Sequence, residues 1–309
     1  MIDVAIIGSG VTGLSAALYA ARYELSTIVI GDFLGGATST AWTVENYPGF
    51  ESIDGYDLVV KMKDQVEKLG VALQTDRVTD IEKKNNTFHL KTETGGEIEA
   101  KTVIFTVGAA RRKINLPKED KFALGKGIHY CTTCDGPLYK GKTIGIVGGG
   151  DASVKGVNLA AQYAEKIYLL VRDDKLNAEP INYQRATKHI DSGLVEVHYK
   201  TEVAELLGDE RLTGVKLKDG RDLTMDGLFI EIGAIPEVDL AVKIGVKLDD
   251  HGYIAVNNMM ETNIEGIYAG GDTTNFFGHF KQIVTGCAMG SVASTSAFKY
   301  ITDNPEARY

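Results

Sequence analysis

The stretch that decides the fold is Val4-Ala5-Ile6-Ile7, followed directly by Gly8-Ser9-Gly10-Val11-Thr12-Gly13. A short apolar run is typical of a buried strand, and the glycines stand where the chain must turn into a helix. Gly8 permits the tight turn, Gly10 lets the backbone approach a pyrophosphate, and Gly13 allows the helix to pack closely on the strand. We expect that helix at Leu14–Tyr23, with its N-terminus facing the phosphates. The pattern predicts a dinucleotide-binding unit.

A second stretch of the same kind begins about 140 residues later. Thr143-Ile144-Gly145-Ile146-Val147 leads into Gly148-Gly149-Gly150-Asp151-Ala152-Ser153 and a helix that is expected to end near Tyr163. Each unit continues with a second strand, expected at Ser26–Ile30 and at Lys166–Val171. Two copies of strand, glycine turn and helix predict the α/β class, with two Rossmann-like three-layer dinucleotide-binding domains.

Short alternating stretches follow in both units and predict meander strands. Phe88–Thr92 is expected with Glu97–Ala100, and Val195–Tyr199 with Gly214–Leu217. Proline and charge interrupt the apolar pattern near Lys113–Pro117 and Pro236–Leu240, so we place the domain boundaries there.

The last part of the chain has a strand pattern at Gly266–Ala269, then Gly270-Gly271-Asp272, then a helix expected to begin near Lys281. This part lacks a glycine-turn unit of its own, so we expect it to complete the first domain. The first domain is then discontinuous, 1–115 and 240–309, and the second domain, 116–239, is inserted into it.

Composition narrows the classes of function. With 309 residues the chain is long enough for two domains, and its 44% hydrophobic and 24% charged residues are ordinary for a globular protein. A net charge of -9 argues against a nucleic-acid ligand, which clustered Lys and Arg would bind. The N-terminus lacks the features of a signal peptide, and no apolar run approaches the ~20 residues that span a bilayer. We therefore expect a cytoplasmic protein without a membrane segment.

The strongest local motif is Cys131-Thr132-Thr133-Cys134-Asp135-Gly136. Two intervening residues let the sulfurs close a disulfide, and such an environment lowers the thiol pKa toward reactivity. Asp135 can relay a proton to and from the thiolates. The alternative is half of a zinc site, but only Cys287 and His129 are at hand as further ligands. We predict a redox-active pair and no metal.

Other candidate residues allow more than one interpretation. Asp272, after two glycines, is placed to accept a hydrogen bond from a polyol hydroxyl of a cofactor, or else to form a turn or cap a helix. Cys287 lies among small apolar residues of a predicted helix and is interpreted as a buried, inert thiol. His129 is interpreted as a polar residue on the approach to the disulfide, and Trp42 as a packing or cofactor-edge residue.

Taken in order, these motifs resemble those of the low-molecular-weight thioredoxin reductases over essentially the whole chain. The matching segments are Gly8–Gly13, Gly35-Gly36, Val44-Glu45-Asn46-Tyr47-Pro48-Gly49, Cys131–Gly136, Gly148–Gly150, Gly271-Asp272 and Lys281-Gln282. The resemblance implies a non-covalent FAD in the discontinuous domain, a homodimer, and a thioredoxin or glutaredoxin-like partner. It implies a second domain that binds NADPH, carries the disulfide and swivels on hinges at the domain boundaries.

The resemblance also assigns residues to roles. Cys134 would be the sulfur nearer the flavin, Cys131 the one that attacks the substrate disulfide, and Asp135 the acid. The residues implied at FAD are Gly8, Ser9, Gly10, Thr12, Gly13, Gly36, Asn46, Gly108, Gly271, Asp272, Lys281, Gln282 and Ile283. Those implied at a nicotinamide nucleotide are Gly148, Gly150, Asp151 and Arg172.

The chain departs from the family where NADPH should be recognised. The family has His-Arg-Arg-Asp-x-x-Arg-Ala after the second strand, and this chain has Val171-Arg172-Asp173-Asp174-Lys175-Leu176-Asn177-Ala178. A 2′-phosphate would meet one guanidinium and two carboxylates, and each charge pair at ~4 Å in a dielectric of ~20 is worth roughly 4 kcal/mol. The attraction of Arg172 is thus largely cancelled. Ser153 and Lys155-Gly156 also depart from the family's pattern.

The sequence leaves open which molecule donates the electrons and in which direction they flow. NADH would fit if Asp173 accepted a hydrogen bond from the ribose 2′-hydroxyl. A vestigial nicotinamide site would leave the input to a low-potential carrier such as ferredoxin or a deazaflavin, and a weakened NADPH site is a third option. Alternatively, a dithiol oxidase would pass electrons to oxygen, and a flavin-bound redox sensor would show no turnover.

Overall fold

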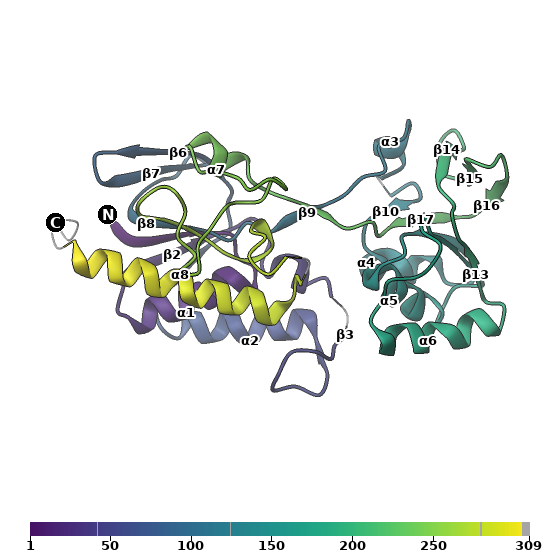
Figure 1. Ribbon diagram of the computed structural model, residues 1–309, viewed down its shortest axis with the longest axis horizontal. Helices are drawn as coiled ribbons and strands as arrows, with labels where there is room; N and C mark the ends of the chain where they lie inside the picture. The colour runs from purple at the N-terminus through teal and green to yellow at the C-terminus, as the bar shows by residue number, and fades with distance from the viewer. Residues whose placement is uncertain (42, 124, 279, 305–309) are drawn as a thin grey trace. The chain divides into compact units, whose positions relative to one another are not determined.

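The computed structural model describes residues 1–41, 43–123, 125–278 and 280–304, so Trp42 lies outside the described residues. The chain forms two compact units (Figure 1). The first is Met1–Ala110 with Pro236–Tyr309, and the second is Arg111–Ile235. The two chain segments that cross from one unit to the other, β9 (Ala109–Arg111) and β18 (Ala234–Pro236), pair as a two-stranded sheet.

The first unit is built on a seven-stranded sheet in the order β5-β2-β1-β8-β7-β6, with β19 paired to β8. Strand β1 is parallel to β2 and β8, β8 is parallel to β19, and β6, β7 and β8 are antiparallel neighbours. The strands are β1 (Ile2–Ile7), β2 (Thr27–Ile30), β5 (Ala72–Gln74), β6 (Val78–Lys84), β7 (Thr87–Thr92), β8 (Glu97–Phe105) and β19 (Ile267–Ala269). The pairing of β19 with β8 is the contact by which the C-terminal segment completes this sheet.

Helices cover one face of this sheet. They are α1 (Val11–Arg22), α2 (Gly55–Glu67) and α8 (Ile283–Asp303). The yellow α8 runs alongside α1 in Figure 1. The two helices can approach closely because Gly290 has no side chain. A Cβ at this position would lie 2.1 Å from the backbone oxygen of Thr12. The apolar core beneath them includes Leu14, Ala17 and Ala293, all fully buried. This face carries the first glycine turn.

The second unit is a five-stranded parallel sheet in the order β10-β17-β11-β12-β13. Its helices α5 and α6 pack on one face, and the three-stranded sheet β14-β15-β16 covers the other through a second apolar cluster. The strands are β10 (Ile128–His129), β11 (Thr143–Val147), β12 (Lys166–Leu170), β13 (Val195–His198), β14 (Val203–Leu207), β15 (Gly214–Leu217), β16 (Asp222–Thr224) and β17 (Gly227–Ile230). The helices are α3 (Glu119–Ala123), α4 (Thr132–Asp135), α5 (Asp151–Ala160) and α6 (Pro180–Asp191).

The expected pairing in this unit was wrong in one place. Val195–Tyr199 was predicted to be a meander strand beside Gly214–Leu217. Instead, β13 is parallel to β12, with Ile167 opposite Val195, and the meander is β14-β15-β16. The reason is α6, which begins with a proline in its first turn and connects β12 to β13 as a crossover helix.

The remaining elements are short. They are η1 (Gly36–Thr38), β3 (Thr43–Val44), β4 (Ile53–Asp54), η2 (Gly136–Tyr139), α7 (Asp239–Lys243) and η3 (Gly271–Thr273). The last helix begins at Ile283, near Lys281 as predicted, and the Gln282 and Thr285 side chains form a capping box at its start. Over the described part of the chain, no helix combines the length and the apolar character needed to cross a membrane.

Candidate active site

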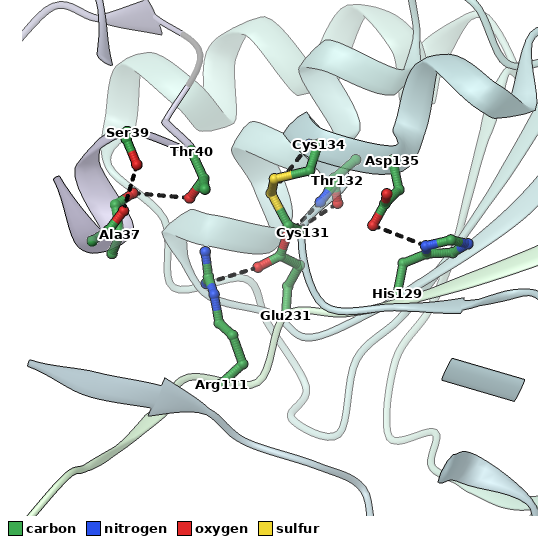
Figure 2. Close-up of a disulfide and its surroundings, with 11 residues drawn as sticks. Ala37, Ser39, Thr40, Arg111, His129, Cys131, Thr132, Cys134, Asp135 and Glu231 are labelled. Carbon is green, nitrogen blue, oxygen red and sulfur yellow. Dashed lines mark hydrogen bonds and ion pairs between the residues drawn. A yellow bond between two sulfur atoms is a disulfide. The ribbon is translucent and has the colours of Figure 1, made fainter. Parts of the chain in front are cut away.

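A disulfide joins Cys131 and Cys134 at the start of the short helix α4, with their Cα atoms 5.4 Å apart (Figure 2). Cys131 is the N-cap residue, and its Sγ accepts a hydrogen bond from the backbone N–H of Cys134 at 3.1 Å. Cys131 is half-buried and Cys134 is exposed, whereas Thr132 between them is only 1% exposed. With their sulfurs bonded to each other, the two cysteines form the redox pair that their spacing predicts.

On one side of the disulfide, His129 holds Asp135. The histidine Nδ1 lies 2.9 Å from Asp135 Oδ2, and Nε2 shares a 2.7 Å hydrogen bond with the hydroxyl of Tyr139. The ring is buried and stacks on Phe229 with centroids 5.1 Å apart. When Nδ1 donates to Asp135, Nε2 accepts from Tyr139, so one tautomer satisfies both contacts. His129 therefore fixes the direction of the Asp135 carboxylate, beyond the general polar role that the sequence indicated.

On another side lies a residue that the sequence analysis missed, Glu231. Its Oε1 accepts hydrogen bonds from the backbone N–H and the hydroxyl of Thr132, each at 3.1 Å. Its Oε2 lies 3.4 Å from the Arg111 guanidinium (Figure 2). Burial raises the pKa of Glu231, although Arg111 acts in the opposite direction. The only signal in the sequence was a single glutamate within the otherwise apolar run Leu228–Ile232.

Gly136 ends the motif because a side chain has no room there. A Cβ at this position would lie 1.8 Å from the hydroxyl of Tyr163, just beyond the end of α5. Burial raises the pKa of Tyr163 to about 12, so this phenol stays neutral. The close approach seats the C-terminal end of α4 against the second unit's helical layer.

The first glycine turn has the form of a phosphate cradle. Gly8 has a φ of +111°, and a Cβ on it would lie 2.4 Å from the backbone oxygen of Thr106. Gly10 is the N-cap of α1 and gives no side-chain cap, and a Cβ on it would meet nothing closer than 3.9 Å. The first N–H groups of α1 are thus left to an anion on an open side, which fits the pyrophosphate of a dinucleotide.

Some of the other predicted FAD residues contact one another, and Thr12 packs inside the first unit. Asn46 donates to Gln282 at 3.0 Å, although the two are 236 positions apart. Burial raises the pKa of Asp272, with Lys281 acting in the opposite direction. Thr12 is buried, and a Cβ on Gly271 would lie 2.5 Å from its hydroxyl, so Thr12 packs helix against turn.

Of the remaining predicted FAD residues, Ser9, Gly13 and Gly36 lie at the first glycine turn. The Ser9 hydroxyl donates to the Phe33 carbonyl at 3.1 Å, and a Cβ on Gly13 would lie 2.0 Å from the Gly8 carbonyl. Gly36 and Gly108 both have positive φ, and Ile283 is the first residue of α8.

Cys287 differs from its predicted state. It lies in α8 as expected, but it is half-buried rather than buried, and its sulfur accepts a hydrogen bond from the Tyr47 hydroxyl at 4.0 Å. Burial still raises the pKa of the Cys287 thiol, which keeps it unreactive.

At the second glycine turn, the Asp151 side chain is bonded to other residues of the chain. The Asp151 carboxylate accepts from the backbone of Glu179 at 3.0 Å and from the Asn182 amide at 2.9 Å, and Lys155 lies 2.7 Å away. Burial by itself would raise the pKa of Asp151, but the bonds from Lys155 and Asn182 lower it overall. Asp151 therefore holds this loop together, and Gly148 and Gly150 form the turn above it.

Arg172 is the one arginine that remains of the family's phosphate-binding pattern. Its side chain is 77% exposed, and its guanidinium lies 3.7 Å from the Asp173 carboxylate. Asn177 donates its backbone N–H to the Gly149 carbonyl at 2.7 Å, which folds the segment back over the glycine turn. The structure thus places a carboxylate directly beside this guanidinium.

A redox-active disulfide beside a carboxylate held by a buried histidine, on a chain with two glycine-turn units, defines a flavin-dependent disulfide oxidoreductase. The family model for pyridine nucleotide-disulphide oxidoreductase matches residues 2–290. The thioredoxin reductase of Treponema pallidum (strain Nichols) is 35% identical, covering 97% of this chain and 97% of the relative. The chain therefore belongs to the pyridine nucleotide-disulphide oxidoreductase family, and within it to the low-molecular-weight thioredoxin reductases.

Solved structures agree with this assignment. Lactococcus lactis thioredoxin reductase superposes with a TM-score of 0.92 at 32% identity, covering 98% of this chain and 100% of that one. A ferredoxin-flavin thioredoxin reductase from Clostridium acetobutylicum is 34% identical, with a TM-score of 0.53 and 98% coverage of both chains. The predicted α/β class with two Rossmann-like domains is confirmed, with mixed parallel and antiparallel strands. The family implies a flavin cofactor, FAD, and the activity is that of a thioredoxin-disulfide reductase.

Proposed function

We propose that this chain delivers electrons from a low-potential donor, through FAD and the Cys131–Cys134 disulfide, to the disulfide of thioredoxin or a glutaredoxin-like protein. The observation that carries the proposal is the bonded cysteine pair, with the Asp135 carboxylate held 2.9 Å from His129 immediately after it. The full-length similarity to thioredoxin reductases supports the same direction of electron flow.

The first unit offers the residues that would hold FAD. The N–H groups at the start of α1 would face the pyrophosphate and Asp272 would accept from a polyol hydroxyl, while the Asn46 side chain is bonded to Gln282 at the beginning of α8. When bound, the flavin supplies a two-electron carrier for the disulfide. The open Cβ position at Gly10 leaves room for a phosphate to reach the backbone.

The cysteines carry out the thiol chemistry. Reduction breaks the Sγ–Sγ bond with two electrons and two protons and gives two thiols. Asp135 accepts the proton of the Cys131 thiol, the resulting thiolate attacks one sulfur of the partner disulfide, and the other partner sulfur leaves as a thiolate to which Asp135 returns that proton. The Cys134 thiol next attacks Cys131, its proton passes to the second partner sulfur as that sulfur leaves, and the disulfide closes again. His129 holds Asp135 in the direction of this exchange.

For the donor we propose NADH or a low-potential carrier such as ferredoxin rather than NADPH. The Asp173 carboxylate beside Arg172 opposes a 2′-phosphate, and the same carboxylate suits a ribose 2′-hydroxyl. The similarity to the ferredoxin-flavin thioredoxin reductase of Clostridium acetobutylicum supports the carrier. We further propose a cytoplasmic homodimer, with the disulfide domain at 116–239.

Anaerobic bleaching of the flavin tests the input side. The purified yellow protein is mixed with NADPH, with NADH and with reduced ferredoxin in parallel, and the flavin absorbance is followed. We expect fast bleaching with NADH or ferredoxin and slow bleaching with NADPH. Fast bleaching with NADPH would contradict the proposed donor preference.

Reduction of thioredoxin tests the output side. The protein is first reduced and then mixed with oxidised thioredoxin, and free thiols are counted with the wild type and with Cys134→Ser. We expect thiol release from the wild type only. Full activity of the Cys134→Ser variant would overturn the proposed route through the disulfide.

A further inference from the structure

A buried carboxylate lies against the first turn of the active-site helix, and the proposed reaction does not use it. Glu231 follows β17, and its side chain is 6% exposed. One of its oxygens accepts both the backbone N–H and the hydroxyl of Thr132, the residue directly after Cys131. Figure 2 shows the Glu231 side chain reaching toward Cys131 and Thr132. A carboxylate is therefore fixed on the residue that directly follows Cys131, whose sulfur must ionise.

Thr132 is held on both of its sides. Its hydroxyl oxygen would lie 2.9 Å from a Cβ on Gly156 of α5, so this glycine leaves the space that the threonine fills. Its backbone N–H and hydroxyl point to Glu231. Because α4 has only four residues, this anchor decides where the helix begins and how Cys131 is presented.

The charges around Glu231 can be assigned element by element. From β9, the Arg111 guanidinium lies 3.4 Å away with a 40% exposed side chain. From α4, Thr132 contributes only neutral donors, and the acid of that helix, Asp135, lies against His129 instead. The glycine turn at Gly148 contributes backbone alone. Arg111 is thus the charged side chain that the structure places against Glu231.

A negative charge beside a thiol disfavours the thiolate and raises the thiol pKa, and a nearby cation does the opposite. The two Thr132 donors and Arg111 favour the charged form of Glu231, whereas its burial opposes it and raises its pKa. The pKa of the Cys131 thiol therefore depends on two opposing charges. The carboxylate of Glu231 raises this pKa, and the guanidinium of Arg111 lowers it.

We propose that Glu231 is a positioning residue that anchors the active-site helix through Thr132 and holds down the ionisation of the Cys131 thiol, with Arg111 offsetting its charge. The inference rests on the proposed thiol chemistry of Cys131. A less ionised thiol reacts more slowly with stray oxidants.

The test measures the pKa of the Cys131 thiol directly. In a Cys134→Ser background, the holoenzyme is alkylated with iodoacetamide from pH 5 to 10, and the peptide containing Cys131 is quantified by mass spectrometry. Glu231→Gln keeps an oxygen acceptor for Thr132 and removes the charge. Arg111→Gln removes the opposing cation. The matched controls are Glu202→Gln, an exposed acid paired with Lys218, and Arg112→Gln, the next arginine along the chain.

We expect Glu231→Gln to lower the midpoint of the pH profile by about one unit, a tenfold increase in thiolate below the midpoint. We expect Arg111→Gln to raise the midpoint, and both controls to match the parent. Opposite shifts support the proposal, because a general loosening of α4 would move both variants in the same direction. Shifts of equal sign, or no difference from the controls, would overturn it.

Two features keep the test decisive. If Glu231→Gln does not fold, Arg111→Gln is compared with its Arg112→Gln control, and a midpoint that is unchanged or lowered in Arg111→Gln overturns the proposal. The alkylation needs no electron donor, no flavin reduction and no thioredoxin. The inference can therefore fail while thioredoxin reduction persists, and the proposed function can fail while the thiol pKa shifts appear.

Discussion

His129 is the residue whose contacts most directly affect the acid of the reaction. It reaches Asp135 with one ring nitrogen at 2.9 Å and Tyr139 with the other at 2.7 Å, inside a buried aromatic contact with Phe229. An acid that must protonate a leaving thiolate works best when its direction is fixed before the thiolate forms. The two hydrogen bonds supply that constraint from within the second unit.

Replacing His129 by Phe keeps an aromatic ring of similar size and removes both hydrogen bonds. We expect kcat for thioredoxin reduction to decrease about tenfold, a part of what general acid catalysis contributes. The loss should be largest at alkaline pH, where solvent protons are scarce. The measurement is kcat against pH. Tyr139→Phe is the control, since it removes only the outer hydrogen bond and should cost less. A uniform loss at every pH would indicate a structural effect instead.

Charge at the second glycine turn gives another prediction at the residue scale. Asp173→Arg combined with Asn177→Arg replaces a carboxylate and an amide by two guanidinium groups beside the exposed Arg172. We expect NADPH to bind at least tenfold more tightly, since one charge pair near the surface is worth roughly 4 kcal/mol before solvent screening. Stopped-flow flavin reduction measures the effect, with NADH as the control nucleotide. Fast reduction of the wild type by NADPH would contradict the charge argument.

At the scale of elements, the crossing of α1 and α8 depends on small residues at particular positions. A Cβ on Gly290 would lie 2.1 Å from the Thr12 backbone oxygen, which cannot move without shifting α1. A Cβ on Gly286 would lie 2.8 Å from the Thr12 hydroxyl, the flexible end of a side chain. The two glycines of α8 thus meet the same residue in different ways.

Gly290→Ala should therefore destabilise the protein, although alanine is the better helix former by about 1 kcal/mol. We expect a loss of about 1–3 kcal/mol in the free energy of unfolding, the usual cost of overpacking. Gly286→Ala should cost less, because the Thr12 side chain can rotate. Thermal unfolding of the flavin-loaded protein measures both. Equal stability of the two variants would show that the helices separate without cost.

The elements also show how far the sequence could predict this fold. Both glycine turns, their strands and the C-terminal return to the first sheet followed from apolar runs and glycine spacing. The partner of β13 did not, because Val-Glu-Val-His has the same alternation in a parallel or an antiparallel pair. The sequence marked Glu231 only as a single glutamate in an apolar run and could not predict its partners. Its contacts with Thr132 span 99 positions and exist only after β17 and α4 come together.

At the scale of the whole molecule, the segments that connect the two units are candidates for hinges. The chain crosses at β9 and at β18, and the backbone N–H of Arg112 donates to the Gly233 carbonyl at 3.0 Å between them. Hinges are short stretches at the ends of elements that absorb changes in φ and ψ. We propose that these crossings let the second unit present its disulfide first to the flavin and then to thioredoxin.

Gly233 offers a way to test this hinge without touching either site. It has a φ of +93°, and nothing lies within 4 Å of a Cβ placed on it, so Gly233→Ala strains the backbone without a clash. Gly220, in the loop between β15 and β16, has a φ of +90° and is equally open, so Gly220→Ala is a matched control. Each variant should lose about 1–2 kcal/mol of stability from the left-handed backbone. Only Gly233→Ala should also change kcat for thioredoxin reduction, because in the proposed hinge only the backbone at Gly233 must move during turnover. We expect a severalfold change in kcat with little effect on KM. Steady-state kinetics and thermal unfolding on the same preparations separate the two effects, and equal kcat values for both variants would argue against a hinge at this crossing.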